Sequence, residues 1–168
     1  MKYFYRIIED NLEIGSGTRI PDGFTEYKKG NEPKELRHML DKKALEKTKN
    51  TKKQELYSAK ETYLTKPINI NGKLFFASET AYAKYKIAYN LGVKKGLTEG
   101  EVILLVDNNP AWATVTKEEM ENYFEAFELQ GYKAERKLGY YLEALQQAKT
   151  EEEINAIVWE DVRDEEQE

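Results

Sequence analysis

The side chains that could do chemistry in this chain are few, and they stand apart from one another. There is no cysteine and one histidine, His38, which lies in a charged stretch with no nucleophile near it in the sequence. The absence of thiols excludes disulfides, thiol catalysis and cysteine-ligated zinc or iron–sulfur sites. We therefore expect His38 to be a surface or interface histidine; a role in binding or in a pH response is the alternative.

Oxygen-bearing side chains form two short groups. Asp107, Asn108 and Asn109 share a predicted turn but lack the spaced carboxylates and closing glutamate of a calcium loop. Residues 151–153 are three glutamates at a predicted helix start, where the helix dipole favours anions. No carboxylate pair lies in an apolar context that would raise its pKa, and no phosphate-loop, dinucleotide or nucleophile-elbow motif is present. We predict no enzyme, no catalytic residue, no cofactor and no metal ligand.

A lysine-rich stretch is the remaining candidate for binding, and its members are Lys42, Lys43, Lys47, Lys49, Lys52, Lys53 and Lys60. Asp41, Glu46 and Glu55 interrupt these lysines, and no aromatic stacking platform is interleaved with them. The whole chain has 26 basic and 31 acidic residues, a net charge of −5 that argues against a general polyanion binder. We interpret the stretch as a solvated helix face, with nucleic-acid contact as the alternative.

Long helices would have to position these side chains. Apolar or small residues recur at alternating steps of four and three: Met120, Phe124, Phe127, Gly131, Ala134, Leu138, Tyr141, Leu145 and Ala148. This spacing predicts a helix over residues 117–149 with a narrow apolar seam, begun by a capping box of Thr116 and Glu119. Gly131 marks a place where the helix could bend or another helix could approach. A second long helix is predicted over 33–63, with apolar residues only near its two ends.

Strand signals surround these helices. Asn71-Gly72 closes a predicted hairpin over residues 68–77, a helix runs from Ser78 to about Lys95, and residues 102–115 fold back at Asp107 to Pro110. Residues 3–27 read as a short β module. The predicted fold class is α+β: an antiparallel four-stranded sheet from two hairpins packed with helices, long helices at 33–63 and 117–149, and a small N-terminal β module.

Three regions follow from this order of elements. Residues 1–31 form the β module, residues 32–51 a charged helical connector, and residues 52–168 an α+β domain. Thr150 and Glu153 form a second capping box that begins a short helix, and we expect the acidic tail over 160–168 to fray. No apolar run approaches the length of a membrane span, and we expect no secretory signal.

Several features of residues 52–160 occur in an order that resembles a known family. They are the charged helix from Lys52, the hairpin over 70–76, the helix from Ser78, the Asp107-Asn108 turn, the long helix opened by 114–116, and the glutamates near 151–154. This order resembles a domain of unknown function at the C-terminus of many phage and prophage tail-fibre and tail-appendage proteins. Residues 20–24 are similar to leader segments of small prophage tail proteins. The family often has a tryptophan before the Asp-Asn turn, whereas here Trp112 follows it.

The resemblance implies a tail-associated structural or assembly protein that acts by protein–protein contact, located in the bacterial cytoplasm or the virion tail. Its partners would be other tail or assembly proteins, and it implies no site residues. Self-association is also expected, because a helix of this length is about 48 Å long, beyond the ~30 Å diameter of a small domain. The alternatives are an intracellular protein- or nucleic-acid-binding module unrelated to phage and, third, an enzyme without a recognisable motif. No membrane partner is expected.

Overall fold

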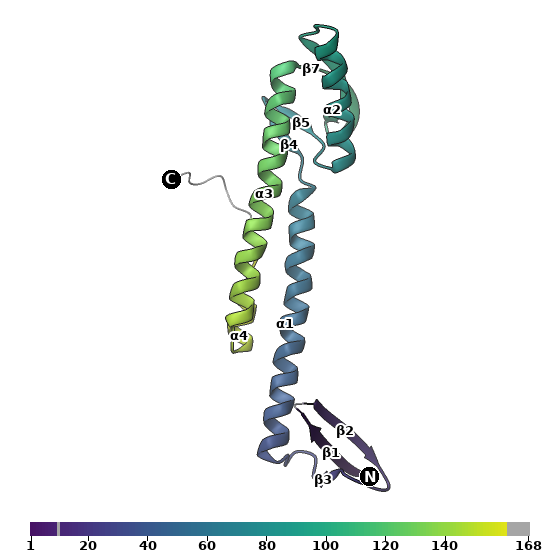
Figure 1. Ribbon diagram of the computed structural model, residues 1–168, viewed down its shortest axis with the longest axis vertical. Coiled ribbons are helices and arrows are strands. Elements are labelled where there is room, and N and C mark those ends of the chain that lie inside the picture. Colours follow the sequence, from purple (N-terminus) through teal and green to yellow (C-terminus); the bar gives the residue numbers. More distant parts are fainter. Residues whose placement is uncertain (10, 161–168) are drawn as a thin grey trace. The chain divides into compact units, whose positions relative to one another are not determined.

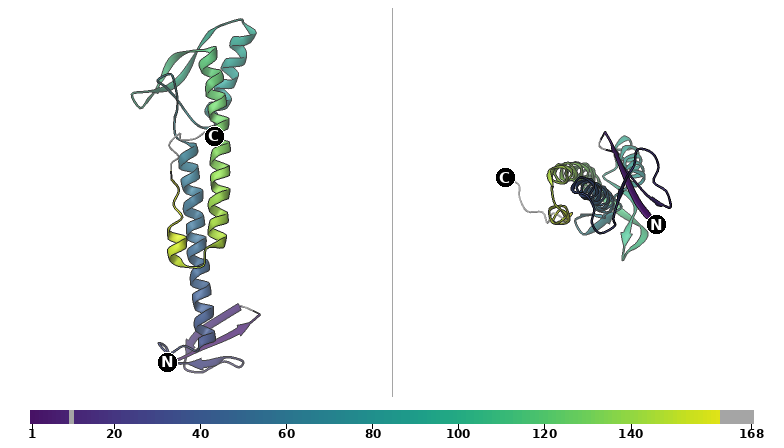
Figure 2. Two further views of the ribbon diagram at one scale, coloured as in Figure 1. Left: turned by 90° about the vertical axis from the view of Figure 1, so that its left-hand side faces the viewer. Right: turned by 90° about the horizontal axis from the view of Figure 1, so that it is seen from below.

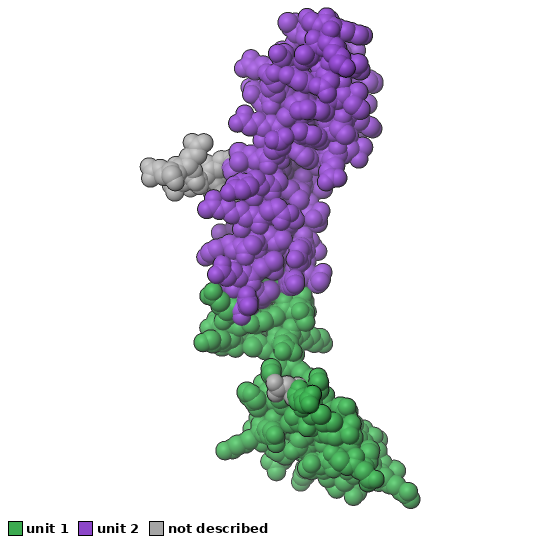
Figure 3. Space-filling model, viewed as in Figure 1, with its two compact units in different colours: residues 1–52, 147–156 green, residues 53–146, 157–168 purple. Residues whose placement is uncertain are grey.

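The computed structural model describes residues 1–9 and 11–160, so the predicted tail beyond Glu160 lies outside the described residues (Figure 1). The chain divides into two compact units, coloured separately in Figure 3. Unit 1 contains residues 1–52 and 147–156, and unit 2 contains residues 53–146 and the segment from Ile157. The division after Lys52 lies one residue from the boundary proposed at 51/52. Residues 147–156, which lie in the predicted α+β domain over 52–168, belong to unit 1.

Strands and helices occur in both units. In chain order the elements are β1 (Lys2–Ile8), β2 (Asn11–Gly17), β3 (Thr25–Tyr27), α1 (Lys34–Leu64), β4 (Ile68–Ile70), β5 (Lys73–Phe75), α2 (Glu79–Lys94), β6 (Glu99–Val106), β7 (Asn109–Thr116), α3 (Lys117–Gln147) and α4 (Glu151–Asn155). The predicted α+β class is confirmed, with a three-stranded sheet, a four-stranded antiparallel sheet and the two long helices within two residues of their predicted ends.

In unit 1, the three-stranded sheet has the order β2-β1-β3 and lies against the first turns of α1 (Figure 1). Strand alternation puts Tyr5 and Leu12 on one face, where they are buried with Leu36 and Met39 of α1. Lys43 Nζ donates a hydrogen bond of 2.7 Å to the carbonyl of Leu12. Three short strands bury little surface alone, so the helix supplies the cover that they need.

The four-stranded sheet of unit 2 has the order β4-β5-β6-β7. Its two tight turns contain Asn71-Gly72 and Asp107-Asn108, and all four residues have positive φ, which is the type I′ pattern. The second turn is shorter than predicted, because Asn109 and Pro110 already belong to β7. Pro110 lies opposite Leu105 on an edge strand, where a missing N–H is tolerated.

Aromatic rings form the core between this sheet and the helices α2 and α3. The Phe75 and Tyr123 rings stack at 4.9 Å between centroids, and Tyr85 meets Tyr123 edge-on at 5.1 Å. Phe124 lies beside them, and Val102 and Leu104 close the core from β6. The heptad seam contains Phe124 but omits Tyr123, which is fully buried one position earlier.

The seam of α3 is covered within the single chain. Met120, Phe124, Ala134, Leu138 and Leu145 are all buried, whereas Phe127 is only partly buried. Helix α3 continues through Gly131, and a Cβ added there would meet no atom of the chain within 4 Å. The close helix approach anticipated at Gly131 is therefore not made by any described residue of this chain.

Within unit 2, the last turns of α1 lie alongside α3, as both views in Figure 1 and Figure 2 show. Lys60 forms an ion pair with Glu135, and Gln130 Nε2 donates to the Tyr63 carbonyl at 2.7 Å. Trp159, which follows α4, contacts the rings of Tyr63 and Tyr141. Trp159 therefore packs against both α1 and α3.

Candidate functional site

The side chains singled out in the sequence do not assemble into one site. His38 is exposed on α1 in unit 1, and Asp107, Asn108 and Asn109 are exposed at the β6–β7 turn in unit 2. Glu153 is used in the predicted capping box: its N–H donates to Thr150 Oγ1 at 3.2 Å and its carboxylate accepts from the Thr150 N–H. Within residues 1–9 and 11–160, no group of three or more His, Asp or Glu side chains could hold a metal ion.

The lysines of α1 are largely engaged within the protein. Lys43 binds the Leu12 carbonyl, Lys60 pairs with Glu135, and Lys53 Nζ lies 6.0 Å from the centroid of the Tyr57 ring. Lys42, Lys49 and Lys52 also have interactions inside the chain. This pattern matches a helix face that is internally paired and solvated, and it gives no separate basis for a phosphate-binding surface.

Glu119 is a buried carboxylate of α3 whose partners come from two other elements, β5 and β7. It completes the predicted capping box by accepting from the Thr116 N–H at 2.8 Å, and its own N–H donates to Thr116 Oγ1 at 3.1 Å. Lys73 Nζ of β5 lies 2.6 Å from Glu119 Oε2 and also donates to the Thr114 carbonyl. Burial raises the pKa of Glu119, but the hydrogen bonds from Lys73 and Thr116 outweigh it, so the net pKa is lowered. This arrangement fixes a helix start and holds no proton ready for transfer.

A groove between α2 and β6 is the strongest candidate for a binding site. It has a volume of about 440 Å³, within the range of ligand-binding clefts. Thr80, Ala81 and Lys84 line it from α2, and Glu101 and Ile103 line it from β6. Trp112 of β7 borders it.

Small and apolar side chains dominate the walls of this α2–β6 groove. Ala81 and Ala88 lie on α2 at positions that leave space beside the strand, and Ser78 caps the helix by accepting from the Ala81 N–H at 3.2 Å. Trp112 is 70% exposed and Ile103 is 42% exposed, directly opposite each other across β6 and β7. An exposed tryptophan at the border of an apolar groove is typical of a protein-interaction site.

Tyr85 fixes the floor of the groove. Its hydroxyl donates to the carbonyl of Ile103 at 2.7 Å, which ties α2 to β6. Burial raises the pKa of Tyr85, so the phenol stays protonated and remains a donor at neutral pH. The floor is therefore uncharged at neutral pH, and the groove carries its charges on Lys84 of one wall and Glu101 of the other.

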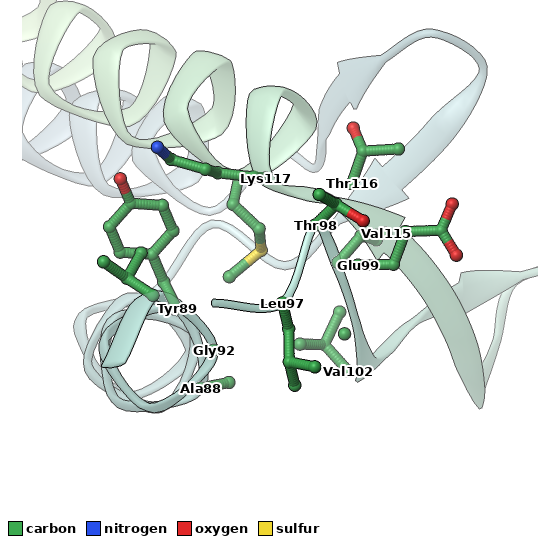
Figure 4. A pocket seen from close by; sticks show the side chains of 13 residues that line it. Ala88, Tyr89, Gly92, Leu97, Thr98, Glu99, Val102, Val115, Thr116 and Lys117 are labelled. Atoms are coloured by element: carbon green, nitrogen blue, oxygen red, sulfur yellow. The ribbon is translucent and has the colours of Figure 1, made fainter. Parts of the chain in front are cut away.

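A second, smaller hollow continues along the same junction of α2 and β6 (Figure 4). Its volume is about 30 Å³, space for only a few water molecules. Ala88 and Val102 line both this hollow and the larger groove, and Leu97, which is 51% exposed, borders the small one. The junction is thus incompletely filled along much of its length.

Every element that builds the groove is predicted from the sequence, but the groove itself is not. Trp112 follows the predicted Asp-Asn turn, and its exposure follows from strand alternation only once the buried face is known. The two alanines of α2 carry no signal by themselves.

No protein-family model, no curated protein and no solved structure matches the chain. In the described part of the chain, no helix is long and apolar enough to cross a membrane. The candidate site therefore rests on its geometry.

Proposed function

We propose that this chain is a prophage-type tail-associated structural or assembly protein that acts by protein–protein contact. The observation that carries the proposal is the exposed Trp112 beside the α2–β6 groove. Tryptophan buries a large area at low conformational cost and is enriched among residues that dominate binding energy. A 70% exposed tryptophan next to an open groove is explained more simply by a partner than by folding.

The tail context comes from the resemblance of residues 52–160 to the C-terminal domain of tail-fibre and tail-appendage proteins. The features that carry this resemblance include the Asn71-Gly72 hairpin, the helix capped by Ser78 and the Asp107-Asn108 turn. Of these, the helix capped by Ser78 forms one wall of the groove. A protein-binding module unrelated to phage would use the same surface. The tail-associated function and this alternative therefore differ only in the identity of the partner protein. The internal pairing of the α1 lysines gives the nucleic-acid alternative no added support.

The test follows the tagged chain in a host strain that carries its gene beside the natural neighbouring genes. After induction, virions, tail intermediates and free protein are separated on a density gradient and probed for the tag. We expect the chain in virions if it is a structural part, and only in tail intermediates if it is an assembly factor. A chain found only as free protein, in a strain whose tails still form after the gene is deleted, would contradict the proposal.

A matched pair of variants links that result to the groove. Trp112→Ser should move the chain to the free fraction, because it removes the exposed ring that we expect the partner to cover. Tyr140→Ser is the control, since Tyr140 of α3 is also 70% exposed and lies outside the groove lining. Circular dichroism of both purified variants checks that the loss reflects binding rather than folding.

A further inference from the structure

One edge of β6 is left without a neighbouring strand where the groove runs. Strand β5 pairs with β6 at Leu74↔Leu105, and the chain then leaves the sheet to begin α2 after Ser78. Among the residues that the structure describes, no strand continues alongside Glu101 and Ile103 on this side. The α2–β6 groove lies along this part of the strand, with Glu101, Val102 and Ile103 in its lining.

The main-chain groups of Glu101 and Ile103 face away from β7, and both residues line the groove. The two-residue turn makes Val106 and Asn109 a hydrogen-bonded pair, so alternate residues of β6, counted back from Val106, bond to β7. The residues between them direct their N–H and C=O away from β7. Two contacts agree: Leu105 pairs with β5 on that side, and the Ile103 carbonyl accepts from the Tyr85 hydroxyl of α2.

A helix over a sheet edge commonly protects it, and α2 does so in part. Tyr85 engages the Ile103 carbonyl. The same hydroxyl accepts a hydrogen bond of 3.4 Å from the Phe76 N–H, so the chain after β5 stays beside Ile103 at this point. The N–H of Ile103 and both main-chain groups of Glu101 face away from β7, beside a space of about 440 Å³. The N–H groups of Glu101 and Ile103 and the C=O of Glu101 therefore present two donors and one acceptor at the spacing of a β-strand. An extended peptide can match this spacing. A helix cannot, because its own backbone groups are already hydrogen-bonded to one another.

We propose that the groove binds an extended peptide segment of a partner protein, which adds to the edge of β6 and continues the line of β5. Its main chain hydrogen-bonds to the N–H and C=O of Glu101 and to the N–H of Ile103. This inference deepens the proposed protein-binding function and rests on it, but it does not depend on the tail context.

The walls specify the side chains of the peptide. Large apolar side chains of the peptide cover Trp112 and Ile103, which supply exposed apolar surface at the border. Lys84 stands on the α2 wall, so a peptide carboxylate directed toward α2 complements it, while a basic side chain suits Glu101. The chemistry is that of an apolar strand with one acidic residue turned toward the helix.

The test begins with a display library of random twelve-residue peptides, selected on the full-length chain and counter-selected on Trp112→Ser. Selected sequences are synthesised and their affinities measured by calorimetry. Each peptide is then N-methylated at one residue at a time. Methylation removes a main-chain donor, so we expect losses of about tenfold or more at alternate positions and little change between them, because an added strand bonds through only one of its edges.

Two substitutions at Glu101 make the same test from the protein side. Glu101→Pro removes the N–H that faces away from β7 and leaves the β6–β7 ladder bonds intact, as Pro110 does on the other edge. Glu101→Ala keeps that N–H and is the control. We expect Glu101→Pro to weaken binding about tenfold or more and Glu101→Ala to retain affinity for peptides that lack a basic residue facing it.

Three results would overturn the inference: a library that yields no Trp112-dependent peptide, an affinity insensitive to N-methylation at every position, or a bound peptide that gains helical circular dichroism. None of them bears on whether the chain sediments with virions or tail intermediates. Conversely, the selected peptides could show alternating sensitivity to N-methylation while the chain never sediments with tail fractions. That result would support strand addition at the groove and reject the tail context.

Discussion

At the scale of single residues, Glu119 shows how a buried charge is stabilised in unit 2. Among the described residues it is the only charged side chain in the buried class, at 7% exposure. A carboxylate out of water costs several kcal/mol unless it is paired and hydrogen-bonded. The Thr116 N–H and Lys73 Nζ supply those bonds at 2.8 and 2.6 Å. The side chain therefore joins the start of α3 to β5.

The lowered pKa of Glu119 predicts a specific loss of stability in acid. Because the folded pKa lies below the unfolded value of about 4.3, the unfolded state binds the proton more readily. The stabilisation is complete above the unfolded pKa and is lost as pH falls through the folded pKa. Urea unfolding at pH 7 and pH 3 should show Glu119→Gln less stable than the natural chain at pH 7, with the difference shrinking at pH 3. An equal difference at both pH values would contradict this assignment.

Phe124 tests the aromatic core. Phe124→Ala removes a buried ring that contacts Tyr82, Tyr89 and Tyr123, and it should lower the free energy of unfolding by about 3–5 kcal/mol. Phe127→Ala should cost less, because Phe127 is only partly buried. Lys47→Ala, on the exposed part of α1, should change it by less than about 0.5 kcal/mol. Similar urea midpoints for Phe124→Ala and Lys47→Ala would refute the burial of Phe124.

At this scale, a contact could be predicted from the sequence when its residues lie close together along the chain. The Thr116–Glu119 capping box spans three residues and was predictable, as was the burial of Phe124 on a seven-residue repeat. Lys73 meets Glu119 across 46 positions, and no local pattern encodes that contact. Tyr123 lies outside the four-three seam. Its burial depends on where the sheet packs against α3, and the heptad spacing carries no information about that position.

At the scale of elements, Gly72 and Gly139 show that the same Gly→Ala change has opposite effects on stability in a turn and in a helix. Gly72 has φ +83° in the β4–β5 turn, so Gly72→Ala should destabilise the chain by roughly 1–2 kcal/mol. Gly139 lies within α3, where an added Cβ meets nothing within 4 Å, so Gly139→Ala should stabilise by about 0.5–1 kcal/mol. Thermal unfolding of both variants checks the opposite signs, and a shift in the same direction would contradict the assigned backbone conformations.

Hairpins, caps and long helices were predictable because each carries its signal within a few residues. The pairing between hairpins was not. Strand β5 leaves β6 after Leu74↔Leu105, and this departure, rather than any strand or turn signal, opens the groove. The site therefore depends on how two locally encoded hairpins meet, which the sequence alone did not show.

At the scale of the whole molecule, the apolar seam of α3 gives no reason for a second copy. Leu138 and Leu145 are each 4% exposed and Ala134 is fully buried within one chain. We predict that the 19.6 kDa chain sediments as a monomer at micromolar concentration, in place of the self-association that the length of the helices suggested. A stable dimer that persists in Trp112→Ser would show that another surface pairs two copies.

The central claim, that the open edge of β6 receives a partner strand, is tested most directly by amide hydrogen exchange of residues 101–104. In the free chain, the amides of Glu101 and Ile103 should exchange quickly, and those of Val102 and Leu104 slowly, because only the latter bond to β7. Adding a selected peptide should slow Glu101 and Ile103 by about tenfold or more and leave the slow exchange of Val102 and Leu104 unchanged. Unchanged exchange at Glu101 and Ile103 with the peptide bound would contradict the account.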